Sequence, residues 1–194
     1  MDILTANIIT RFDSIDLADV SAGIEWYADA REFCITLAAE CGYTAAQVAG
    51  VVAAVSPLNS WASNKALAER IVRAGGGLTS GYLPLGLRKA DAILAGASAL
   101  RTLNAQKTSN FWLAITSGGR RGICIDRHAH DIAMGRPYTD KERGGVSGKR
   151  YDTIAAAYVG AAAELSARGC VISPAELQSV TWVSWVEEFG GTRR

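Results

Sequence analysis

Apolar residues recur at helical spacing along nearly the whole chain, and this feature most constrains the fold. One stripe precedes Gly42, a natural helix terminator, and its members share one face: Trp26, Ala30, Phe33, Leu37 and Cys41. Ser21 is a suitable N-cap for this helix. No stretch alternates between apolar and polar residues as a half-buried strand does. The sequence therefore predicts an all-α fold.

Capping residues and glycines divide the rest of the chain into further helices. Residues 44–47 and 173–176 have the form of capping boxes, in which two side chains three residues apart satisfy the first backbone N–H groups. Helices are expected at these ranges: 61–74, 84–100, 108–116, 126–135 and about 154–165. The glycine-rich segment 136–150 is predicted to be a loop.

The composition fits one globular unit or two small lobes, with 194 residues of which 49% are hydrophobic and 20% charged. No apolar run approaches the ~20 residues of a membrane span, and Met1-Asp2 does not begin a signal peptide. The four cysteines are scattered, which favours a reduced compartment. We therefore expect a monomeric cytoplasmic protein with no membrane contact.

The charge pattern is local. A net charge of only +1 gives no overall basic field of the kind that indicates nucleic-acid binding. However, Arg120, Arg121 and Arg127 surround one glycine loop. Further cations lie in the segment 136–150, namely Arg136, Lys141, Arg143, Lys149 and Arg150. Such clusters can contact phosphates, and the alternative is a solvated loop without a partner.

Residues 107–134 contain the main candidate for a chemical site. Lys107 begins one expected helix, and Asp126 begins the next as its N-cap, after the glycine loop 117–122. A primary amine and a carboxylate held together are the parts of an imine-forming or acid–base site. The alternatives are a solvated lysine and an aspartate that only caps a helix.

A metal site is a second interpretation of the same stretch. Cys124, Asp126, His128 and His130 alternate, and on an extended strand all four would face one way as ligands. On a helix that begins at Asp126 they would point apart. We favour the helix, so we expect no metal, with one histidine in the core and His130 on the surface.

Four segments, in order, resemble the helix-hairpin-helix/Gly-Pro-Asp superfamily of DNA glycosylases, which is endonuclease III-like. Val51–Ala66 is similar to the segment that inserts into DNA, and Gly86–Ile93 to the helix that leads to the hairpin. Lys107-Thr-Ser-Asn110 and Ile123–His128, on either side of the glycine loop, are similar to the active-site stretch. The resemblance covers about residues 48–135.

This resemblance implies a two-lobed helical fold that holds double-stranded DNA. Residues 46–126 would form a central lobe with a degenerate hairpin, and residues 1–45 plus 127–194 a second helical lobe. Lys107 would be the nucleophile and Asp126 the supporting carboxylate for cleavage of the N-glycosidic bond of a flipped base. No cofactor is expected, because the cysteine cluster that binds the iron–sulfur centre of many relatives does not follow Asp126.

The same resemblance implies a set of DNA contacts. Asn59 and Trp61 lie where relatives carry residues that wedge into DNA, although Trp61 is equally suited to a core. Asn104 and Gln106 belong to the hairpin, which lacks its usual glycine, and Asn104 can adopt the left-handed conformation in its place. The other implied contacts are Arg120, Arg121, Arg127 and His128.

Two details resemble a divergent, phage-type branch associated with DNA base hypermodification. They are Ser56-Pro-Leu-Asn59 and the Arg127 that follows Asp126. That branch is thought to join an amine or amino acid to an activated thymine methyl group in DNA with modified pyrimidines. Three functions therefore stay open: a glycosylase, a hypermodification transferase in the host cytoplasm, and a catalytically silent DNA-binding module.

Overall fold

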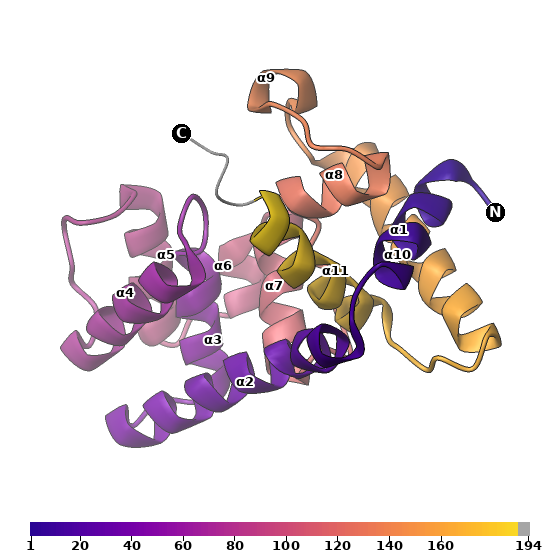
Figure 1. Ribbon diagram of the computed structural model, residues 1–194. Coiled ribbons are helices and arrows are strands. Elements are labelled where there is room, and N and C mark those ends of the chain that lie inside the picture. The colour runs from indigo at the N-terminus through magenta and orange to yellow at the C-terminus, as the bar shows by residue number, and fades with distance from the viewer. Residues whose placement is uncertain (190–194) are drawn as a thin grey trace. The chain divides into compact units, whose positions relative to one another are not determined.

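The computed structural model describes residues 1–189, and every regular element in that range is a helix (Figure 1). In chain order the helices are α1 (Ile3–Asp13), α2 (Leu17–Cys41), α3 (Ala45–Ala54), α4 (Trp61–Ala74), α5 (Pro84–Leu94), α6 (Ala99–Leu103), α7 (Gln106–Ser117), α8 (Arg127–Met134), α9 (Asp140–Arg143), α10 (Gly148–Ala167) and α11 (Pro174–Phe189). The predicted all-α class is confirmed.

The chain divides into two compact units. Unit 1 combines Met1–Tyr27 with the chain from Gly119 onward, and unit 2 is Ala28–Gly118. These boundaries fall inside α2 and just after α7, whereas the sequence prediction placed them after residues 45 and 126. The second part of α2 therefore belongs with the central helices, and the loop that leads to Asp126 belongs with α8.

In unit 2, helix α3 is the centre, because it packs against α4, α5, α6 and α7. Its residues 48–54 are all buried. Gly50 permits the closest approach: a Cβ at this position would lie 2.9 Å from a methyl of Ile93 and 3.1 Å from Ala99. A side chain at position 50 would push α5 and α6 away from α3, so this glycine keeps the α6–α7 pair against the core.

In unit 1, helices α1, α8, α10 and α11 pack around one hydrophobic core. Its most buried members include Ile8, Ile132, Ile154, Tyr158 and Leu177. Each of the isoleucine and leucine side chains contributes about 1.5–3 kcal/mol when fully buried. Gly23 of α2 lets α11 cross closely, because a Cβ there would lie 2.5 Å from the Cα of Val180. This packing fixes the helix that carries Trp182.

Both predicted capping boxes are confirmed. The Thr44 side chain accepts from the Gln47 N–H, and the Gln47 side chain accepts from the Thr44 N–H. At the start of α11, the Glu176 N–H donates to Ser173 Oγ at 3.1 Å and the Ser173 N–H donates to Glu176 Oε2 at 2.8 Å.

Three boundary predictions were wrong. Helix α2 begins at Leu17, so Ser21 lies inside it and does not cap it. The expected helix 84–100 is two helices, α5 and α6, separated by a turn in which Gly96 has a φ of 97°. The segment 136–150 contains α9 and the start of α10, and its Thr139 and Glu142 form a third capping box.

Among residues 1–189, no single helix is both long and apolar enough to cross a membrane. Helices α2 and α3 together pass a test of length and composition alone, but they are bent by 115° at the break between them.

Candidate active site

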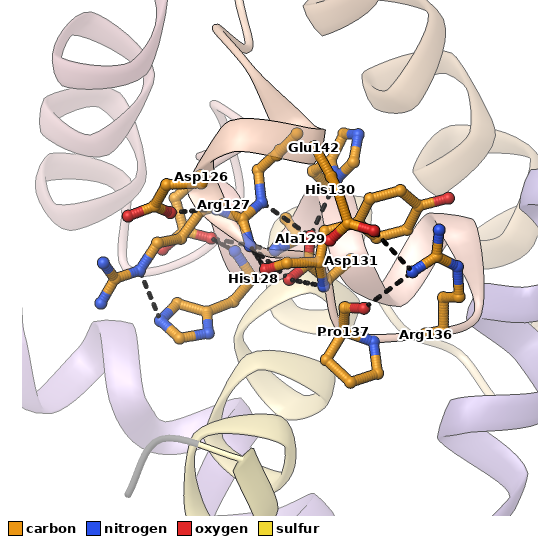
Figure 2. A network of polar contacts seen from close by, with 12 residues as sticks. Asp126, Arg127, His128, Ala129, His130, Asp131, Arg136, Pro137 and Glu142 are labelled. Atoms are coloured by element: carbon orange, nitrogen blue, oxygen red, sulfur yellow. Dashed lines mark hydrogen bonds and ion pairs between the residues drawn. The ribbon is translucent and has the colours of Figure 1, made fainter. Parts of the chain in front are cut away.

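Asp126 is the N-cap of α8, as predicted. Its Oδ1 accepts hydrogen bonds from the backbone N–H groups of His128 and Ala129, both at 2.9 Å (Figure 2). An N-cap of this kind satisfies donors that have no partner within the helix. The cap therefore uses one carboxylate oxygen and leaves the other for a different contact.

The second oxygen of Asp126 faces an indole. Trp182 of α11 donates its Nε1–H to Asp126 Oδ2 at 3.2 Å. The Trp182 ring makes edge-to-face contacts with Trp26, at 5.6 Å between centroids, and with His128, at 6.2 Å. Asp126, Trp26 and Trp182 are all partly exposed. Unit 1 therefore holds a partly accessible carboxylate among aromatic rings.

His128 is a buried neighbour of Asp126. Only 6% of its surface is exposed, and its Nε2 accepts from Arg127 Nε at 3.3 Å. Burial lowers the pKa of His128, with Asp126 opposing that effect and Arg127 adding to it. The ring is therefore neutral at neutral pH. Any part of His128 in DNA binding would act through the exposed Arg127, whose contact with DNA stays a prediction.

The glycine loop before Asp126 presents two arginines. Gly119 of this loop is buried, and its carbonyl accepts from Ser173 Oγ at 2.7 Å. Arg120 and Arg121 follow and are exposed. The loop is thus tied to the start of α11 at one end, while its two cations face solvent in the same unit as Asp126.

In unit 2, a tight turn at Asn104 joins α6 to α7 in the segment predicted to be a degenerate hairpin, whose role in DNA binding stays a prediction. Asn104 ends α6 with a left-handed φ of 48°, as expected for the position usually occupied by glycine. Lys107 and Gln106 lie in the first turn of α7, and both are partly exposed. Lys107 and Asp126 belong to different units, so their pairing at one site stays a prediction.

Sequence reasoning missed Lys89 of α5. Its ammonium donates to the carbonyl of Leu103 at 2.7 Å and to Asn104 Oδ1 at 2.9 Å. Both acceptors belong to the hairpin turn, so Lys89 holds the turn from outside. No sequence signal identifies this role, because the lysine lies 14 residues before Leu103.

The turn between α3 and α4 also presents a residue that was not predicted, while the DNA contacts of Asn59 and Trp61 stay predictions. Asn59 bonds inward, from Nδ2 to the Val55 carbonyl at 3.2 Å, and Trp61 begins α4 with its ring 6.5 Å from that of Phe33. Leu58 is instead 88% exposed and has a left-handed φ of 61°. The sequence signal that could have identified Leu58 was an apolar residue directly after a proline in a loop.

A family model matches residues 1–189, and its description is a family of unknown function, DUF7178. The chain belongs to the DUF7178 family. No curated protein and no solved structure matches the chain. The function of this DUF7178 member is therefore inferred from its own sequence and geometry.

A buried polar network corrects the prediction for the basic segment (Figure 2). Arg143 is 3% exposed and donates to both carboxylate oxygens of Asp131, at 2.8 and 2.7 Å. Burial alone would raise the pKa of Asp131, but hydrogen bonds from Arg143, His130 and the Tyr138 N–H together lower it. Arg143 therefore ties the segment to α8 and is not a phosphate contact.

Other residues of this network also differ from expectation. His130 was expected on the surface, but it is 1% exposed, with Nδ1 2.9 Å from Asp131 Oδ1. Arg150 donates to the backbone carbonyl of Arg143, and the Arg136 guanidinium lies 3.7 Å from the centre of the Tyr138 ring. Much of this basic charge therefore has partners within the protein.

The metal interpretation does not fit the described part of this DUF7178 chain. Among residues 1–189, no group of three or more His, Cys, Asp or Glu side chains is arranged to hold a metal ion. His128 and His130 lie on α8, where residues two apart point in different directions. Their hydrogen bonds go to Arg127 and Asp131 instead.

Proposed function

We propose that this chain is a DNA-processing enzyme that extrudes a base from the duplex and cleaves its N-glycosidic bond. The proposal includes the two-lobed, glycosylase-like fold, with Lys107 as nucleophile and Asp126 as the supporting carboxylate. An enzyme that acts on a base within a duplex must first take it out of the stack.

The observation that carries the proposal is Leu58. A left-handed leucine costs about 1–2 kcal/mol, and at 88% exposure it regains almost nothing by burial. The turn is nevertheless fixed, since Tyr82 OH donates to the carbonyl of Pro57 and Asn59 bonds back to Val55. Backbone strain held by its surroundings is typical of functional sites. An apolar side chain held in this way is suited to insertion between base steps.

The charge of the sequence segment between Asp91 and Asp126 supports a polyanionic partner. No acidic residue occurs between Asp91 and Asp126, whereas this stretch contains Arg101, Lys107 and the two arginines of the glycine loop. Each phosphate neutralised by such a cation adds a salt-dependent contribution to affinity. The left-handed Asn104 and its bond from Lys89 give the hairpin a fixed turn despite the absence of glycine.

The proposed chemistry uses the amine of Lys107 and the carboxylate of Asp126. The Lys107 amine forms a bond to the anomeric carbon as the C–N bond to the base breaks, and the base leaves with the electron pair and takes up a proton. Asp126 offsets the positive charge that develops on the sugar. Opening of the sugar ring then gives an imine between the lysine and the former anomeric carbon.

Analysis of the products tests the proposal. Wild-type protein is incubated with duplexes that carry normal, damaged or modified pyrimidines, with and without added amines or amino acids, and the nucleosides are analysed by mass spectrometry. We expect a free base and an abasic site. A base enlarged by the mass of an amine would instead indicate the hypermodification transferase, and binding without any product would indicate the silent DNA-binding module.

A further inference from the structure

The two oxygens of Asp126 have different partners, and one contact exceeds what a cap requires. Oδ1 receives both backbone N–H groups of the α8 start, so the cap is complete without Oδ2. Oδ2 receives the indole N–H of Trp182, which is 56 residues further along the chain. The indole N–H therefore orients Oδ2, the carboxylate oxygen that takes no part in the cap.

A second tryptophan of α11, Trp185, shows that an indole N–H in this helix can lack an acceptor among the described residues. The need for an acceptor therefore does not explain the hydrogen bond between Trp182 and Asp126. Trp185 is 5% exposed, and its Nε1 has no hydrogen-bond partner among residues 1–189. Within residues 1–189, helix α11 therefore holds a buried indole N–H that has no acceptor. Trp182 is only partly buried, so water could satisfy its N–H, yet the N–H is directed at Asp126.

The direction of the Trp182 ring is set by its neighbours. Trp26 of α2 and His128 of α8 contact it edge-to-face, with interplanar angles of 62° and 89°. His128 also supplies one of the two N–H groups that hold Oδ1. The carboxylate and the indole are thus fixed by the same short segment, as a preorganised catalytic group requires.

We infer that Trp182 is a positioning residue that fixes Oδ2 of Asp126 for reaction, an inference that rests on the proposed function. Among residues 1–189, the three hydrogen-bond partners of the carboxylate are all N–H donors, which complement its acceptor-only form. Asp126 then acts through negative charge and does not donate a proton. The substrate class that fits is a nucleoside whose sugar becomes positively charged as the bond to the base breaks.

A matched pair of variants tests this role. Trp182→Phe keeps an aromatic ring and removes the N–H on Asp126, whereas Trp185→Phe removes an N–H that bonds nothing among the described residues. A hydrogen bond to a charged group corresponds to about ten- to hundredfold in rate. We expect Trp182→Phe to lose that factor in kcat with little change in KM for DNA, and Trp185→Phe to retain wild-type kinetics.

A second readout is independent of activity. In 15N-labelled protein, Asp126→Asn keeps the cap but changes the group that faces the indole, so the Nε1–H resonance of Trp182 should move and that of Trp185 should not. An unmoved Trp182 resonance, or equal kinetics of the two phenylalanine variants, overturns the inference and leaves the proposed function in place. A wild-type protein that alters no duplex overturns both.

Discussion

A single side chain, Asp126, caps α8 through Oδ1 and accepts the indole N–H of Trp182 through Oδ2. We predict that Asp126→Asn keeps the fold, because asparagine caps about as well as aspartate, but loses the reaction, because the charge is gone. Asp126→Ala should in addition lose about 1 kcal/mol of unfolding free energy with the cap. Urea unfolding and the product assay measure the two effects, and an Asn variant with full activity would make Asp126 purely structural.

Leu58 gives a second prediction at the residue scale. Leu58→Gly removes the strain of the left-handed conformation, so stability should hold or rise by up to about 1 kcal/mol, while base extrusion should fall strongly. The readout is the fluorescence of 2-aminopurine placed at the target position, which rises on unstacking. Val171→Ser, which changes an equally exposed apolar residue, is the control. If both variants extrude the base as the wild type does, Leu58 is not the wedge.

Helix ends and turns were predictable where the sequence signal lies in neighbouring residues. The capping boxes, the Asp126 cap and the left-handed Asn104 follow from neighbouring residues alone. The contacts of Lys89, Trp182 and Arg143 were not predictable, because each depends on how separate helices pack. The break after Leu94 was also missed, since the apolar spacing continues across it while the chain turns at Gly96.

The hairpin element depends on Lys89, whose ammonium bonds both Leu103 and Asn104. Lys89→Met should cost roughly 1–3 kcal/mol and weaken DNA binding, since the turn loses its support. Arg88→Met removes the same charge from an exposed neighbour and is the matched control. Salt-dependent binding of both variants separates the effects: an equal loss of affinity would show that Lys89 contributes only its charge.

At the scale of the whole molecule, the two histidines set the response to acid. Burial lowers the pKa of both His128 and His130 below 6.5, so the unfolded chain binds protons first as the pH falls. Stability should therefore be constant above about pH 7 and decline below about 6.5. Urea midpoints between pH 5 and 8 measure this. The variant with both histidines changed to Gln should show a flatter profile, and an unchanged slope would contradict the assignment.

The proposed mechanism requires a covalent bond to Lys107, in the first turn of α7. Borohydride trapping on a duplex with an abasic site, followed by peptide mapping, tests it most directly. We predict a covalent adduct mapped to Lys107 and none with Lys107→Gln, which should still bind DNA with a salt slope smaller by about one unit at most. Lys141→Gln, in an exposed position of unit 1, should trap as the wild type does. No adduct with any abasic or modified duplex, or an adduct on another amine, would contradict the account.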